Sequence, residues 1–84
     1  MNPRLLATVK GILTVLSRAD GRAQLDTVIH GELNTEVSPH ATASEFDAAM
    51  AHADRARWIR SARDAAGRNR WQITPEGQNA LADL

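Results

Sequence analysis

Arginine is the residue type whose spacing in this 84-residue sequence points most directly to chemistry. The segment 55–70 holds six arginines against a single acid, Asp64, and carries a net charge of +5. Guanidinium groups bind phosphate through paired hydrogen bonds, so this cluster is suited to a nucleic acid backbone. Alternatively, the arginines form a solvated surface paired with the chain's own acids, and both interpretations stay open. The six are Arg55, Arg57, Arg60, Arg63, Arg68 and Arg70.

Acidic side chains gather in the segment that precedes these arginines. Residues 20–54 carry a net charge of −6 and residues 1–19 carry +3, although the whole chain is neutral. Because the two signs are segregated along the chain, we expect a dipolar surface that is suited to a polyanion or to a charged copy of the chain itself. The acids are Asp20, Asp26, Glu32, Glu36, Glu45, Asp47 and Asp54.

The remaining reactive side chains do not form a recognisable site. His30, His40 and His52 lack the three- or four-residue separation of a helical zinc site, and the chain has no cysteine. A glycine-rich phosphate loop and a recognisable nucleophilic triad are also missing. We therefore expect no enzyme activity, no cofactor and no metal.

The arginine cluster coincides with a predicted β-hairpin. Residues 58–62 and 70–74 contain aromatic and β-branched side chains, which are typical of half-buried strands. Between them, the turn-like sequence DAAGRN contains Gly67 and Asn69, which tolerate positive φ angles. The tryptophans of the two strands could stack on bases, but we interpret Trp58 and Trp71 as core residues.

Four helices are predicted around the hairpin. Asn2 and Thr74 can cap helices, and each precedes a proline, Pro3 or Pro75, at the first helical position. Apolar residues recur at spacings of three and four after these starts. The helices are expected over 3–18, 23–33, 42–56 and 75–83.

Local signals also predict how the helices begin and end. Thr42 and Glu45 have the spacing of a capping box, and Gly21 is placed to end the first helix in the left-handed conformation. Gly31 lies inside the second predicted helix, which indicates either close packing by another helix or a break. Residues 34–40 are expected to form a loop anchored by Val37.

The length of the chain fits one domain, residues 1–84, which buries only about 60% of its unfolded surface. No apolar run approaches the roughly 18 residues that a membrane span needs, and we identify no signal peptide. A chain without cysteine fits a reducing compartment. We expect a soluble, cytoplasmic protein with no membrane partner.

The order helix, helix, helix, strand, strand, helix resembles a winged helix-turn-helix domain: mainly α with a small β-hairpin, in which a three-helical bundle precedes the hairpin wing and a C-terminal helix. The strand entry at 58–59, the DAAGRN turn and the sequence WQITPEG are similar to the wing and exit of MarR-type and PadR-type transcriptional regulators. The resemblance implies a regulator that contacts double-stranded DNA through helix 42–56 in the major groove and through the wing 60–70. It assigns DNA contacts to Ser44, Ala48, Ala51, His52, Arg55, Arg60, Arg63, Arg68 and Arg70.

The chain departs from the family pattern in three ways. Seven residues, 34–40, separate the second and third predicted helices, where the connection is usually tight, and Arg57 occupies a position where glycine is common. The helix 42–56 also carries Glu45, Asp47 and Asp54, which repel phosphate. These departures favour an alternative, a winged-helix protein-protein interaction module, as in a phage or mobile-element assembly, that uses its acidic and basic patches.

A homodimer through helix 3–18 is a further hypothesis. The apolar stripe of this helix is broad, because Val15 extends it, and a domain of this size is not expected to cover all of it.

Overall fold

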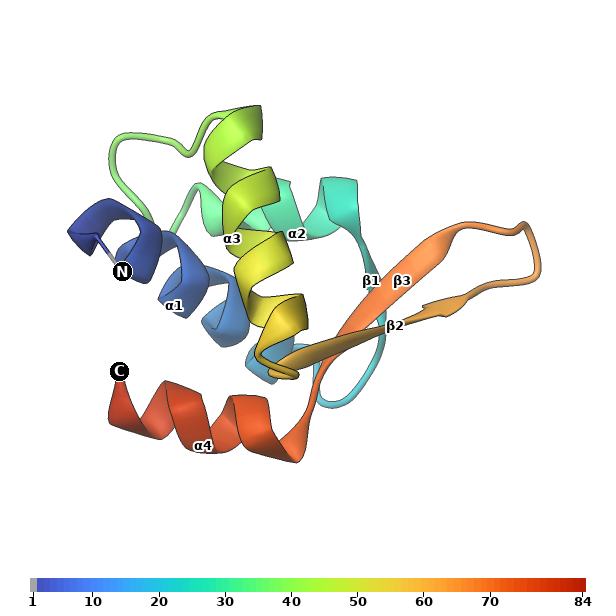
Figure 1. Ribbon diagram of the computed structural model, residues 1–84. Helices are drawn as coiled ribbons and strands as arrows, with labels where there is room; N and C mark the ends of the chain where they lie inside the picture. The colour runs from blue at the N-terminus through green and yellow to red at the C-terminus, as the bar shows by residue number, and fades with distance from the viewer. Residues whose placement is uncertain (1) are drawn as a thin grey trace.

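The computed structural model describes residues 2–84, which form four helices and a three-stranded antiparallel sheet (Figure 1). The protein is mainly helical, and a long β-hairpin projects from the helical body (Figure 1). None of the helices in residues 2–84 has the length and apolar character needed to cross a bilayer. The elements are α1 (Pro3–Arg18), β1 (Gln24–Leu25), α2 (Asp26–Leu33), α3 (Ala43–Arg55), β2 (Ile59–Arg63), β3 (Asn69–Ile73) and α4 (Pro75–Asp83).

Helix α1 is the central element of the core. Its apolar stripe contacts α2, α3, α4 and β3, and Gly11 allows α2 to approach so closely that a Cβ atom there would lie 2.5 Å from Leu33 Cδ1. Most of the stripe that motivates the homodimer hypothesis is thus covered within the chain, whereas Leu5 and Leu6 at its N-terminal end are half-buried, and the homodimer stays a prediction. The fully buried residues of the stripe are Val9, Ile12, Leu13, Val15 and Leu16.

The prediction of a helix over 23–33 was wrong at its beginning. Gln24 and Leu25 form β1, which pairs with Trp71 and Arg70 of β3, and α2 begins only at Asp26. A strand of two residues has no periodicity that sequence could reveal, and its backbone groups find partners only when β3 lies beside it. Gly31 neither breaks α2 nor allows close packing by another helix. The helix is unbroken, and a Cβ atom at this position would meet nothing within 4 Å.

The hairpin was predicted to within one residue. The observed strands are 59–63 and 69–73, and β3 lies between β1 and β2. Gly67 adopts a φ of 79° as predicted, but Asn69 belongs to β3 and is not among the residues with positive φ. Trp58 and Trp71 pack against the core and remain partly exposed.

The predicted starts of α3 and α4 are confirmed by their hydrogen bonds. Thr42 Oγ1 accepts from the Glu45 N–H at 3.1 Å, and the Glu45 carboxylate accepts from the Thr42 N–H at 2.9 Å. Thr74 Oγ1 accepts from the Gly77 N–H at 3.0 Å. Val37 is buried and anchors the loop that leads to α3. These contacts fix where α3 and α4 begin.

Candidate nucleic-acid interface

Helix α3 presents a narrow exposed face. Its buried residues pack on α1, and the side chains on the opposite side are exposed as the periodicity predicts. Three of them are small, so the helix backbone itself is accessible along this face. The exposed set is Ser44, Ala48, Ala51 and Arg55.

His52 differs from the other residues assigned to this face. It is half-buried, because its ring meets the ring of Trp58 edge-on at a centroid distance of 5.6 Å. The aromatic contact ties His52 to the junction between α3 and β2. Its reach toward a ligand is therefore smaller than that of Arg55.

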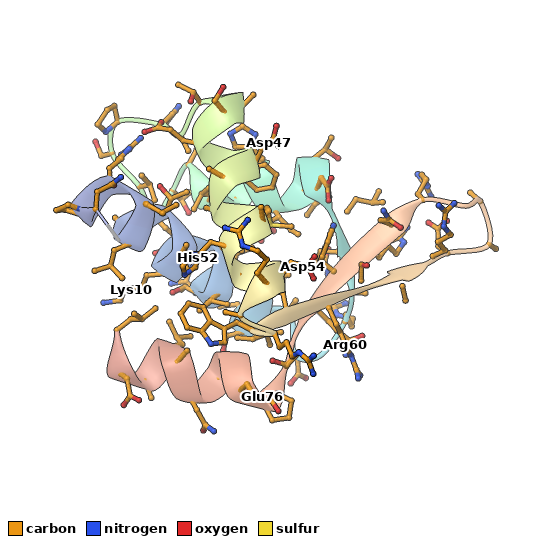
Figure 2. The ribbon with its side chains drawn as sticks, in the orientation of Figure 1. Lys10, Asp47, His52, Asp54, Arg60 and Glu76 are labelled. Atoms are coloured by element: carbon orange, nitrogen blue, oxygen red, sulfur yellow. The ribbon has the colours of Figure 1, made fainter. Side chains whose placement is uncertain are left out.

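Two acids flank the exposed face of α3. Asp47 and Asp54 are both exposed, and Figure 2 shows them spread along α3, with Arg60 beyond Asp54 at the base of the hairpin. They lie seven residues apart, close to two helical turns, and so occupy the same flank. Their charges oppose an approaching phosphate backbone. The acidic character predicted for this helix is thus present on one flank of its exposed face.

The third acid of α3, Glu45, is neutralised by α1. Arg4 Nε donates to Glu45 Oε2 at 2.7 Å, Arg4 NH2 donates to Oε1 at 3.1 Å, and the same nitrogen donates to the Pro39 carbonyl at 2.7 Å. The side-chain hydrogen bond from Arg4 and, after it, the bond from the backbone N–H of Thr42 lower the pKa of Glu45 to about 2. Arg4 therefore fixes the N-terminal end of α3, a role for which its sequence position gives no signal.

Two of the predicted wing contacts are held by an acid of the hairpin turn. Asp64 Oδ2 accepts from Arg70 Nε at 2.9 Å and from Arg68 Nε at 3.2 Å, and Oδ1 accepts the backbone N–H groups of Arg68 and Ala66. The pKa of Asp64 is lowered to about 2, first by the Arg68 backbone N–H and then by the Arg70 side chain. Arg68 and Arg70 thus pair with the acid of their own turn and not with acids of α2 or α3.

The other arginines of the segment have no carboxylate partner among residues 2–84. Arg55 on α3 and Arg60 on β2 are exposed, and Arg63 NH1 donates only to the Gly67 carbonyl at 3.3 Å. Arg57 is exposed as well, in the turn between α3 and β2. These guanidinium groups are available to an external anion.

His30 is held by contacts with neighbouring elements of the fold, whereas His40 is exposed in the loop before α3. His30 stacks on Phe46 with a centroid distance of 4.6 Å and an interplanar angle of 3°, and its Nε2 donates to the Ala41 carbonyl at 2.8 Å. Within residues 2–84, no three His, Cys, Asp or Glu side chains gather as a metal site would require. His30 instead links α2 to the start of α3.

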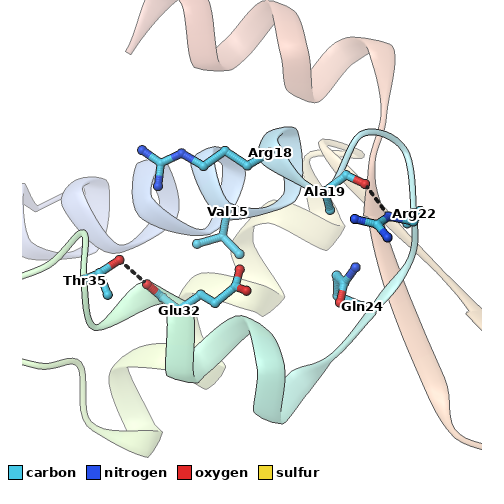
Figure 3. A pocket seen from close by; sticks show the side chains of 7 residues that line it. All are labelled: Val15, Arg18, Ala19, Arg22, Gln24, Glu32 and Thr35. Carbon is cyan, nitrogen blue, oxygen red and sulfur yellow. Dashed lines mark hydrogen bonds between the residues drawn. The ribbon is translucent and has the colours of Figure 1, made fainter.

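The surface also has shallow depressions. One of about 470 Å³ lies between the end of α1, β1 and α2, where Arg22 Nε donates to the Ala19 carbonyl and Thr35 Oγ1 donates to the Glu32 carbonyl (Figure 3). None of the predicted DNA contacts lines it. Another, of about 310 Å³, lies between α1 and α3, and Ser44 and Ala48 border it. The exposed face of α3 therefore continues into a groove at its N-terminal half.

No known protein family, no characterised protein and no solved structure gives a significant match to this chain. The candidate interface therefore rests on geometry alone. An exposed helix face and a projecting hairpin lie next to each other in the chain, and their arginines divide into a set tied to Asp64 and a set without a carboxylate partner in residues 2–84.

Proposed function

We propose that this chain is a winged-helix DNA-binding protein that regulates transcription, with α3 in the major groove and the β2–β3 hairpin as the wing on the phosphate backbone. The observation that carries the proposal is the set of exposed arginines without carboxylate partners on α3 and β2: Arg55, Arg60 and Arg63. The small residues Ser44, Ala48 and Ala51 support it, because they allow the helix backbone to approach the base edges closely.

The arrangement predicts binding in which phosphate contacts dominate. Arg55 is the only exposed residue on the assigned face of α3 whose side chain can donate paired hydrogen bonds to a guanine edge. If Arg55, Arg60 and Arg63 each neutralise one phosphate, the slope of log K against log salt is about −2.7. Sequence discrimination should therefore be modest, and affinity should fall steeply with salt.

The test is a polarisation titration of the chain with mixed genomic duplex fragments over a series of salt concentrations. The double variant Arg60→Ala, Arg63→Ala should bind more weakly and reduce the magnitude of the slope by about 1.8. The matched control, Arg18→Ala with Arg22→Ala, removes the same charge at the end of α1 and should leave the slope unchanged. Failure of the wild-type chain to bind at low salt, or an equal loss in the control, would contradict the proposal.

A second candidate function is a winged-helix module that binds protein. It is favoured by the exposed carboxylates of Asp47 and Asp54, which lie beside the face assigned to DNA. In that case the acidic flank of α3 would contact a basic partner, and removing the two charges would weaken the complex. The same substitutions should strengthen DNA binding, so they distinguish the two functions.

A further inference from the structure

Strand β2 forms an outer edge of the sheet. The strand order is β1-β3-β2, so β2 pairs with β3 on one side only. The hairpin projects away from the helices, which leaves this edge accessible along the outer part of the strand (Figure 1). An unpaired edge presents a row of backbone donors and acceptors on which another strand can pair.

The hydrogen bonds at the two ends of the hairpin show which backbone groups point outward. At the base, the Thr74 N–H donates to the Trp58 carbonyl at 2.9 Å, and at the tip the Asp64 N–H donates to the Arg68 carbonyl at 2.9 Å. In an antiparallel pair, hydrogen-bonded residues alternate with non-hydrogen-bonded ones. On the β2 side of the hairpin, both of these bonds involve even-numbered residues, Trp58 and Asp64.

It follows that Arg60 and Ala62 exchange their backbone hydrogen bonds with β3, opposite Gln72 and Arg70. The intervening residues Ser61 and Arg63 direct their N–H and carbonyl groups to the open edge. All three residues from Ser61 to Arg63 are exposed, and the side chains at 61 and 62 are small. Another backbone can therefore approach this edge without a steric obstacle.

The positive charges on the open edge of β2 favour a partner strand with acidic side chains. Arg60 and Arg63 are exposed, project to opposite faces of the strand, and have no carboxylate partner in residues 2–84. Pairing of β2 with a second copy of β2 would bring these arginines together, which is unfavourable. A strand with acidic side chains would place opposite charges beside them.

We propose that the open edge of β2 binds an extended acidic segment of a partner protein, which adds to the sheet as a fourth strand. The partner's backbone pairs with Ser61 and Arg63, and its carboxylates contact the guanidinium groups of Arg60 and Arg63. This binding surface is distinct from the exposed face of α3 but shares Arg60 and Arg63 with the wing proposed to contact DNA, and it requires the strand backbone as well as the arginine charges.

The probe is a capped peptide of about seven residues with glutamates at adjacent central positions and threonines at its ends, so that an extended chain presents carboxylates on both faces. It is added to the isotope-labelled full chain, and amide hydrogen exchange is followed by NMR. Saturation should slow exchange at Ser61 and Arg63 by about tenfold or more, whereas Arg60 and Ala62, already bonded to β3, should change little. A peptide with lysine in place of glutamate should not bind. Binding of the acidic peptide without slower exchange at Ser61 and Arg63 would overturn the proposal, as would absence of binding.

A pair of variants tests the role of the backbone. Ser61→Pro removes an outward N–H without removing a bond to β3, and Ser61→Ala keeps that N–H while removing the hydroxyl. The dissociation constant for the peptide should rise about tenfold in Ser61→Pro relative to Ser61→Ala. Equal affinities would mean that charge alone holds the peptide and would overturn strand addition. If Ser61→Pro disrupts the hairpin, the hydrogen-exchange measurement on the wild-type chain still tests whether the peptide adds to β2 as a strand.

Discussion

Arg4 in the first turn of α1 and Glu45 in the first turn of α3 form a bidentate ion pair across 41 residues of sequence, with N–O distances of 2.7 and 3.1 Å. The same arginine donates to the carbonyls of Pro39 and His40 in the loop before α3. One side chain therefore joins α1, this loop and the N-terminal end of α3. The orientation of the exposed face of α3 depends on it.

This ion pair predicts a specific loss of stability in acid. Arg4 first and the Thr42 N–H second lower the pKa of Glu45 from 4.5 to about 2 in the folded chain. A depressed folded pKa contributes stability that is fully present above the unfolded value and is lost as pH falls toward the folded value. In Glu45→Gln, stability measured by urea unfolding should therefore fall less steeply between about pH 4.5 and pH 2 than in the wild-type chain.

Arg4→Met provides the companion measurement, because it removes the largest cause of the shift while retaining much of the side-chain volume. As in Glu45→Gln, the free energy of unfolding of Arg4→Met should fall less steeply with decreasing pH than that of the wild-type chain. Wild-type steepness in either variant would show that the ion pair does not set the acid response. Asp64, whose pKa is also lowered to about 2, remains in both variants and accounts for part of the residual slope.

Two glycines should respond oppositely to alanine. A Cβ atom at Gly77 would lie 2.1 Å from the Trp58 carbonyl oxygen and 2.7 Å from Ile73 Cγ1, so Gly77→Ala should destabilise the fold by about 1–3 kcal/mol. Gly31 is exposed within α2, with open space around the added atom, and Gly31→Ala should stabilise by up to about 1 kcal/mol. Urea unfolding of the two variants measures both effects. A stabilising Gly77→Ala would refute the close packing of α4 on Trp58, and a destabilising Gly31→Ala would refute the open space at α2.

Arg57 has a backbone conformation that favours glycine. Its φ is 63°, and α3 ends with the Trp58 N–H bonded to the Ala53 carbonyl and the Arg57 N–H bonded to the Asp54 carbonyl. This is the hydrogen-bond pattern of a helix terminus with a left-handed residue, where glycine is usual. Arg57→Gly should stabilise the fold by about 1 kcal/mol. Arg55→Gly, two residues earlier in the last turn of α3, should cost about 1 kcal/mol, and thermal unfolding of both variants compares them.

The acids on the flank of α3 should limit DNA affinity. Replacing Asp47 and Asp54 by asparagine removes two exposed negative charges beside the assigned groove contacts, and affinity for duplex DNA at low salt should rise roughly threefold or more. The control, Glu76→Gln with Asp83→Asn, makes the same charge change on α4 and should have a smaller effect. A drop in affinity after the α3 substitutions would count against the placement of α3 in the groove.

Much of the fold was predictable because its signals are local. Asn2, Thr42 and Thr74 cap helices through bonds to amides three residues away, so their positions alone mark where α1, α3 and α4 begin. The strands of the hairpin were found to within one residue, since the turn chemistry and β-forming residues lie in one short segment. The exposed face of α3 followed from the periodicity of its buried residues.

By itself, the sequence determined the order of the helices, the bounds of α1, α3 and α4 to within one residue, the hairpin and the concentration of arginine on it. Tertiary structure alone decided which charges remain available, because pairing depends on which side chains the fold brings together, across 41 residues for Arg4 and Glu45 and across the hairpin for Arg70 and Asp64. It added β1 to the sheet, joined Arg4 to Glu45, and tied Arg68 and Arg70 to Asp64. A charge count treats all six arginines of 55–70 alike, whereas the folded chain leaves Arg55, Arg60 and Arg63 as the exposed cations of α3 and β2 without carboxylate partners in residues 2–84.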